Sequence, residues 1–254
     1  MKNFVTLDIR FKNSRNITLA GKLELPASPQ YFAIFSPCFT CTKETLATYR
    51  ISQQLAKKHA AVLRLDFTGL GESEGDFADS NFSTMIDDII CANNYLTEHY
   101  QQASVLLGHS MGGTASYAAA AVLNEIKAIV SIASPSTPSH VLHHFGDALD
   151  KLKAGITSEF FVAGKAYGIK PQFLHDLEKH RLDTDIATLK KAILIFHAEG
   201  DKLVGIEHAE HLFLNARHPK SFISLDSADH VLTERSDALY VAGLIDSWCR
   251  RYLP

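Results

Sequence analysis

The sequence predicts an α/β fold, with a mostly parallel sheet of eight strands that carries helices on both faces. Two observations lead to this prediction. Short apolar runs alternate with longer stretches of helical periodicity, and no repeat, charge run or low-complexity linker divides the chain. Strands that are apolar throughout belong to sheets with both faces covered. We therefore expect a single domain over residues 1–254.

The first two predicted strands form a hairpin. Val5–Phe11 and Ile17–Leu25 flank a polar, turn-like segment, and Pro26 closes the second strand. The other six strands are compact apolar runs at Tyr31–Phe35, Ala61–Leu65, Ser104–Leu107, Ile126–Ala133, Ala192–Phe196 and Ser221–Leu225. The helical patterns cover Glu44–His59, Phe82–His99, Thr114–Val122, Ile206–Arg217 and about Asp237–Arg251. Helices between strands favour a parallel sheet, because each returns the chain to the same edge.

One connection, between Ala133 and about Lys191, is too long for an ordinary crossover. Part of it has helical periodicity, since one helical face holds four apolar residues: Val141, Phe145, Ala148 and Leu152. Pro171 is placed to start a second helix at Gln172–His180. We predict that Ser136–Ile186 is an insertion that lies over the sheet as a helical lid; the alternative is a longer crossover.

Composition limits the classes of function. The chain has 254 residues, 46% of them apolar and 21% charged, which excludes a disordered protein. Its net charge of −3 argues against a nucleic-acid or anionic-membrane partner and leaves a small molecule as the expected one. No apolar run reaches membrane-spanning length, the first residues form no signal core, and four cysteines make no disulfide framework. We therefore expect a cytoplasmic protein.

The sharpest chemical signal lies at Val105–Gly113, where an apolar strand leads into Gly-x-Ser-x-Gly and a helix of small residues follows. A serine on so tight a turn projects its hydroxyl outward, and the flanking glycines avoid clashes in the bend. The N-terminus of the helix offers unpaired N–H groups to a developing oxyanion. Ser110 is therefore the predicted nucleophile.

A nucleophilic serine needs a base, and the base needs an orienting carboxylate. In a sheet of this type both follow later strands, in the order serine, acid, histidine. His230 is the predicted base, because no other histidine follows the final predicted strand. The strand before it is followed by Glu199 and Asp201, of which Asp201 is the preferred acid and Glu199 the weaker candidate.

Two other segments have functional alternatives that the residues do not favour. The glycine-rich Gly69–Gly75 has the wrong spacing for a dinucleotide loop, and its glutamates would repel a pyrophosphate. His140, His143 and His144 lie close together, but no carboxylate or cysteine stands at a matching spacing, so we expect a solvated or pocket-edge face there. We predict neither a cofactor nor a metal ion.

Three segments, Leu65–Gly75, Gly108–Gly113 and His218–Phe222, carry a family resemblance. Nearly the whole chain resembles the α/β-hydrolase superfamily, and most closely the serine hydrolase half of bacterial proteins that are often fused to an OsmC-family domain. We expect no such domain here, because the chain stops three residues after its last predicted helix. The resemblance implies the α/β-hydrolase fold and a triad of the serine, aspartate and histidine named above, without naming a substrate.

The resemblance also implies an oxyanion hole of two backbone N–H groups. One belongs to the residue after the nucleophile, Met111, and the other to the loop after the third strand, where many members have His-Gly-x. This chain has Pro37-Cys38-Phe39 there, so Phe39 is the implied second donor. Cys38 and Cys41 either pack in this loop or form a redox pair, whose oxidation would bend the backbone around Phe39 and lower turnover.

These residues predict a serine hydrolase that cleaves carboxylic esters or thioesters of small soluble substrates through an acyl-enzyme at Ser110. The alternative is a non-catalytic or redox-responsive binding protein on the same fold that uses the loop of Cys38 and Cys41. The presence of serine, acid and histidine in chain order favours the enzyme, because a binding module does not need all three.

Overall fold

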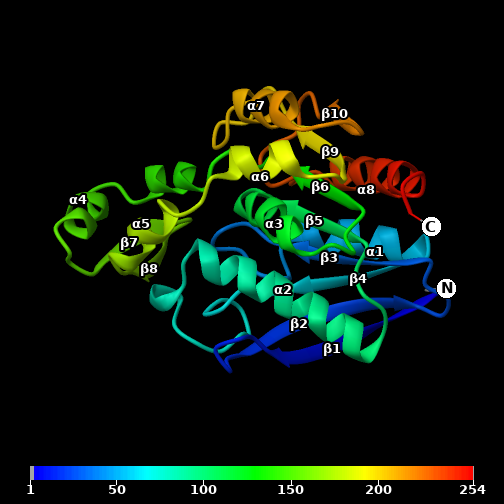
Figure 1. Cartoon of the computed structure of the whole chain (residues 1–254), viewed down its shortest axis with the longest axis horizontal. Coiled ribbons are helices and arrows are strands. Elements are labelled where there is room, and N and C mark those ends of the chain that lie inside the picture. The colour runs from blue at the N-terminus through cyan, green and yellow to red at the C-terminus, as the bar shows by residue number, and fades with distance from the viewer. Residues whose placement is uncertain (1–2, 254) are drawn as a thin grey trace.

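The computed structural model describes residues 3–253, and its centre is a sheet of eight strands (Figure 1). The strands lie in the order β1-β2-β4-β3-β5-β6-β9-β10. Their bounds are β1 Phe4–Lys12, β2 Thr18–Pro26, β3 Tyr31–Ser36, β4 Ala60–Leu65, β5 Val105–His109, β6 Ala128–Ile132, β9 Ala192–His197 and β10 Lys220–Ser224. Neighbours are parallel except for β1 with β2 and β2 with β4. The predicted fold class is confirmed.

Helices cover both faces of the sheet, as predicted. One face carries α1 (Leu46–Lys57) and α8 (Arg235–Cys249), and the other carries α2 (Phe82–His99), α3 (Met111–Val122), α6 (Leu182–Thr188) and α7 (Glu207–Asn215). Alternate residues of the strands enter two apolar cores; Ile34 faces the α3 side and Phe35 the α1 side. All residues of β3, β4, β5, β6 and β9 are buried, which explains why these strands are mostly apolar. None of the helices within residues 3–253 has the length and apolarity to cross a lipid bilayer.

Most of the 136–186 segment lies beyond one end of the sheet, in green at the left of Figure 1. It contains the 3-10 helix η2 (Pro138–His144), α4 (Ala148–Lys153), the hairpin of β7 (Ser158–Val162) and β8 (Lys165–Ile169), α5 (Gln172–Leu177) and the start of α6. The single helical face predicted from Val141 to Leu152 is wrong in one respect: Gly146, with a φ of +46°, separates η2 from α4. A left-handed residue cannot continue a right-handed helix. The hairpin was not predicted.

The loops that bear the predicted site residues meet at one edge of the sheet. Because β3, β5, β6, β9 and β10 are parallel, the segments that follow them all leave from their carboxyl ends. A short 3-10 helix, η1 (Phe77–Asp79), also lies near this edge and contacts β8 of the 136–186 segment. Such an edge is where open α/β sheets bind their ligands.

Candidate active site

Ser110 occupies the turn between β5 and α3. Its φ of +52° and ψ of −128° are backbone values outside the populated regions, which cost a non-glycine residue roughly 1–3 kcal/mol. The turn is fixed to β6 by a hydrogen bond of 2.8 Å from the N–H of Ser110 to the carbonyl of Ile132. Ser110 therefore has the strained, well-supported backbone of a nucleophile elbow.

The glycines around the serine are required by close packing. A Cβ on Gly108 would lie 2.3 Å from the Cα of Gly113, and a Cβ on Gly112 would lie 2.2 Å from the carbonyl oxygen of Pro37. Neither position has room for a side chain. Gly112 thus brings α3 against the loop after β3, which carries Phe39.

His230 and Asp201 are joined by a hydrogen bond of 2.7 Å between Nδ1 and Oδ2. The other oxygen of the carboxylate accepts N–H bonds from Leu203 at 2.9 Å and from Val204 at 3.0 Å. Because an ionised carboxylate only accepts, the proton of the neutral imidazole lies on Nδ1. Nε2 is thus left with a lone pair that can accept the proton of a hydroxyl group.

Asp201 is held in its charged form. Burial raises the pKa of this carboxyl, but the hydrogen bonds from His230 and from the N–H groups of Val204 and Leu203 outweigh burial, so the pKa lies below its ordinary value. Glu199 is exposed, and within residues 3–253 it has no hydrogen bond to His230. The structure therefore brings Asp201, the preferred candidate, to the histidine.

A second histidine, His109, binds the backbone of the predicted base, His230. Its Nε2–H donates to the carbonyl oxygen of His230 at 2.7 Å. Burial, with a smaller effect of the neighbouring His230, lowers the pKa of His109 to about 4, so its imidazole is neutral at pH 7. This contact could not be predicted from the sequence, since His109 stands at a variable position of Gly-x-Ser-x-Gly and no other sequence feature marks it.

Four predicted site residues line one cavity of about 30 Å³: Phe39, Ser110, Met111 and His230. The other lining residues are Pro135, His140, Val141, His143, His144, Leu203 and Val204. Within residues 3–253, the backbone N–H groups of Phe39 and Met111 have no hydrogen-bond acceptor; Met111 is the first residue of α3, where the N–H has no partner in the helix. Two such N–H groups beside a serine can stabilise an oxyanion.

The Phe39 loop, residues 36–43, contains a disulfide between Cys38 and Cys41. Of the two arrangements left open by the sequence, the structure has the bonded one, and Phe39 lines the cavity with the disulfide closed. The ring of Phe39 packs against four others with centroids 5.3 to 6.3 Å away: Phe77, Phe145, Phe160 and Phe173.

The first histidine of η2 belongs to a chain of hydrogen bonds. His140 Nε2–H donates to the carbonyl of Leu203 at 2.9 Å, and His140 Nδ1 accepts from His208 Nε2–H at 3.1 Å. His208 Nδ1 accepts in turn from the N–H of Ser136 at 3.2 Å. This chain ties η2 to α7 and to the loop of Asp201. No set of three His, Cys, Asp or Glu side chains in the described part of the chain is placed to hold a metal ion.

Solved structures of several hydrolases have the same fold. The esterase domain of a Rhodothermus marinus protein is 37% identical, with a TM-score of 0.81 over 98% of this chain and 100% of that one. Est1E from Butyrivibrio proteoclasticus, solved with ferulic acid bound, is 18% identical, with a TM-score of 0.79 over 96% of this chain and 98% of that one. Mouse alpha/beta hydrolase domain-containing protein 10 is 18% identical, with a TM-score of 0.80 over 96% and 99%. At 18% identity, the last two show the fold alone.

A search of curated proteins found no match. The sequence nevertheless shows the family of this chain. The model of the serine aminopeptidase S33 family matches residues 43–186, more than half of the chain. The matched stretch includes the glycine-rich Gly69–Gly75 and the turn at Ser110. The chain therefore belongs to the serine aminopeptidase S33 family and is a hydrolase of the α/β-hydrolase superfamily.

Proposed function

We propose that the protein is a serine hydrolase that cleaves carboxylic esters of small soluble substrates through an acyl-enzyme at Ser110. The observation that carries the proposal is the 2.7 Å bond between Asp201 and His230, beside the cavity that His230 shares with Ser110. Two other residues that line this cavity, Phe39 and Met111, have backbone N–H groups without an acceptor within residues 3–253. A nucleophile, a base, an orienting acid and oxyanion donors are the parts that acyl transfer needs.

In the proposed reaction, His230 Nε2 takes the proton of Ser110 as the serine oxygen attacks the carbonyl carbon of the substrate. The oxyanion accepts hydrogen bonds from the N–H groups of Phe39 and Met111, while Asp201 stabilises the imidazolium. The alcohol leaves with the proton from His230, and the acyl group stays on Ser110. Water then attacks the acyl-enzyme as His230 takes one of its protons; the Ser110 oxygen leaves with that proton from His230, and the carboxylic acid is released.

The lining of the cavity favours an ester over a peptide with a free amino terminus. An aminopeptidase has to bind an α-ammonium group, and a cation removed from water needs an anionic partner. Among the described residues that line the cavity there is no Asp or Glu, and there are three histidines besides the base: His140, His143 and His144. An uncharged acyl group meets no such requirement. Thioesters present the same carbonyl and belong to the same proposed substrate class.

The size of the cavity supports a lid. About 30 Å³ admits little more than water, whereas pockets for drug-sized ligands enclose roughly 300–1,000 Å³. Four of the eleven lining residues come from η2: His140, Val141, His143 and His144. We therefore infer that the 136–186 segment acts as a lid and that η2 moves when an ester enters. Shortening Val141 to Ala should shift the preferred acyl chain to a longer one, and an unchanged preference would argue against this role.

A fluorophosphonate probe tests the proposed function directly. We expect the probe to label the protein once, at Ser110 by mass spectrometry, and a panel of p-nitrophenyl esters of increasing acyl length to give the preferred chain. Ser110→Ala is the matched control and should stay unlabelled. A binding protein without catalysis, the alternative reading, would neither react with the probe nor release p-nitrophenol.

A further inference from the structure

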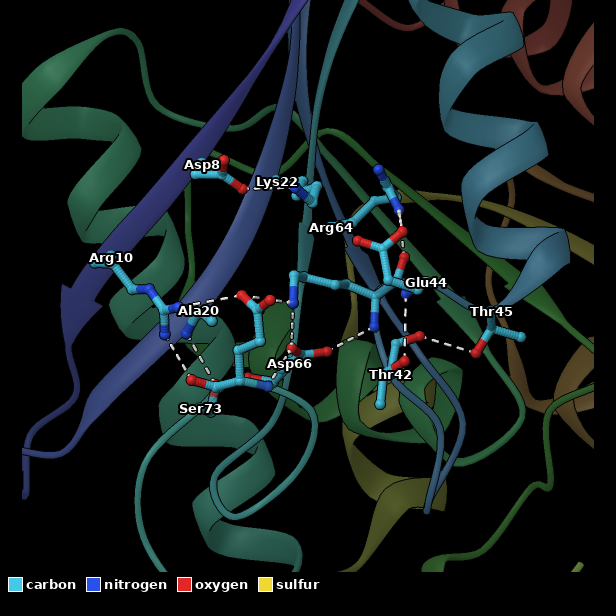
Figure 2. Close-up of polar contacts among 12 residues, drawn as sticks. Asp8, Arg10, Ala20, Lys22, Thr42, Glu44, Thr45, Arg64, Asp66 and Ser73 are labelled. Atoms are coloured by element: carbon cyan, nitrogen blue, oxygen red, sulfur yellow. Dashed lines mark hydrogen bonds and ion pairs between the residues drawn. The ribbon is translucent and has the colours of Figure 1, made fainter.

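A buried ion pair outside the triad lies at the end of the Phe39 loop. The ammonium of Lys43 is 2.6 Å from the carboxylate of Asp66, and the two side chains are 2% and 0% exposed. Figure 2 shows the polar contacts around Asp66 and Arg64, where loops and strands from distant parts of the sequence meet. A buried pair adds little net stability, because desolvation offsets most of the attraction between the charges. The main effect of this pair is therefore expected on the geometry of the Phe39 loop.

The backbone of Lys43 is held as firmly as its side chain. The N–H of Lys43 donates to Asp66 Oδ1 at 2.6 Å, and Arg64 Nη1 donates to the Lys43 carbonyl. Arg64 is bound in turn by Glu24 of β2 at 2.7 Å, with both side chains at most 1% exposed. Lys43 is thus attached through its carbonyl to Arg64 of β4, and through its N–H and its ammonium to Asp66, the residue after β4. Arg64 extends these contacts to β2.

The glycine-rich Gly69–Gly75 makes room for the carboxylate of Asp66. Gly71 has a φ of +56°, and a Cβ there would lie 2.2 Å from Asp66 Oδ2. The next residue, Glu72, donates its N–H to the same oxygen at 3.0 Å and places its carboxylate 3.3 Å from Lys43 Nζ. The segment therefore wraps a buried carboxylate, which accounts for a glycine at position 71 without a nucleotide.

Lys43 follows Phe39 by four residues, just after a turn that a disulfide closes. The disulfide joins Cys38 to Cys41, and the N–H of Cys41 donates to the carbonyl of Cys38 at 3.1 Å. On the other side of Phe39 the loop continues from Ser36, the last residue of β3. The position of the Phe39 N–H is thus fixed by β3 at one end and by Lys43 at the other.

We propose that Lys43 and Asp66 are positioning residues of the oxyanion hole: their ion pair holds the Phe39 N–H where it meets the developing oxyanion. The inference rests on the proposed function and deepens it. An oxyanion donor acts only within about 2.7–3.1 Å of the oxyanion, so a loop without this anchor loses part of its stabilisation of the transition state. Because ground-state binding of the ester does not use that hydrogen bond, kcat falls and KM does not.

The test compares Lys43→Met with the wild type on an ester and on the matching thionoester, in which sulfur replaces the carbonyl oxygen. A sulfur anion accepts hydrogen bonds weakly, so thionoester turnover depends little on the Phe39 N–H. Removing a whole oxyanion donor costs about 10²–10³ in kcat, and we expect Lys43→Met to cost roughly 10- to 100-fold on the ester. The expected loss on the thionoester is less than about threefold, with KM for the ester changed less than about threefold.

Two further variants make the result decisive. Asp66→Asn keeps the size of the side chain and an acceptor for the Lys43 N–H, and should show the same selective loss on the ester if Lys43→Met does not fold. Asp88→Asn is the matched control, because Asp88 is equally buried but binds Asn13 and Thr68 instead of the Phe39 loop. Its kcat for the ester should stay within about twofold of the wild type.

Equal losses on the ester and the thionoester, or a rise in KM alone, in a variant that still unfolds cooperatively would overturn the positioning role. Failure of the proposed function would look different. In that case the wild type itself would not hydrolyse the ester and would not be labelled by the fluorophosphonate at Ser110.

Discussion

The acid–base side and the oxyanion side of the site are built in different ways. On the acid–base side, the proposed chemistry belongs to two side chains, His230 and Asp201, which meet at 2.7 Å in the loops that follow β10 and β9. On the oxyanion side, the proposed stabilisation of the transition state comes from the backbone N–H groups of Phe39 and Met111. The chemistry of a side chain follows from its residue type, whereas every residue except proline has the same backbone N–H group, so the sequence does not distinguish an oxyanion donor. The acid–base side therefore depends on which residue types are present, and the oxyanion side depends on the contacts that fix the backbone.

The nucleophile serves both sides, and its removal should have the largest effect. We expect Ser110→Ala to lower kcat for ester hydrolysis by at least about 10⁴-fold, because only binding and the oxyanion donors remain. Circular dichroism and thermal unfolding should show the fold unchanged. More than about a tenth of wild-type activity in the folded variant would rule out the serine mechanism.

The acid–base side can be tested within a single loop. Asp201→Asn should lower kcat by about 10⁴-fold, because an amide favours the wrong tautomer of His230. Glu199→Gln, two residues away and exposed, should leave kcat within about twofold of the wild type. Steady-state kinetics on one p-nitrophenyl ester measures both, and the reverse ranking would move the acid to Glu199.

His109, which binds the backbone of His230, should make the free energy of unfolding depend on pH. Its folded pKa of about 4 lies below the ordinary value of 6.5, so between these values the unfolded chain binds more protons and stability falls as the pH falls. The loss begins near pH 6.5, ends near pH 4, and is on the order of 3 kcal/mol in total. Denaturant unfolding at pH 7 and pH 4.5 should show a smaller difference in unfolding free energy for His109→Gln than for the wild type. Equal differences would contradict a neutral, buried His109.

The disulfide of the Phe39 loop should give the smallest effect, and its sign tests the oxyanion side. The sequence predicts that the closed disulfide lowers turnover. Because Phe39 lines the cavity with the bond closed, we expect the opposite sign, with kcat lower by roughly 3- to 10-fold after reduction by dithiothreitol. Cys41→Ser should be insensitive to dithiothreitol. Activity that rises on reduction in the wild type alone would restore the original hypothesis.

Local patterns account for what could be predicted from the sequence. Five fully buried strands give short, mostly apolar runs. The turn at Ser110 needs its glycines within four residues of one another, so both features can be recognised in short windows of sequence. The pairing of Asp201 with His230 followed from the order of the strands. The hairpin β7–β8 was not predicted because its strands are short and only partly buried, and Phe161 is exposed.

The anchor of the Phe39 loop could not be predicted in the same way. Lys43 and Asp66 are separated by 23 positions, and a lone lysine between polar residues normally indicates an exposed side chain. Its burial follows from the partners around it, and those partners are recognised only after β2, β4 and the glycine-rich segment have been placed. The glycines of Gly69–Gly75 are visible in the sequence, but the sequence does not show that Gly71 makes room for the carboxylate of Asp66.

The bond from His109 to the carbonyl of His230 joins residues 121 positions apart. Closing a loop of that length costs chain entropy before the contact can form. Contacts between residues far apart in the sequence therefore slow folding. The elbow around Ser110 can form as soon as β5, β6 and α3 have come together, but the base reaches it only when the last two strands dock. During refolding we therefore expect ester hydrolysis to return no earlier than the docking of β9 and β10, because the proposed base reaches Ser110 only then.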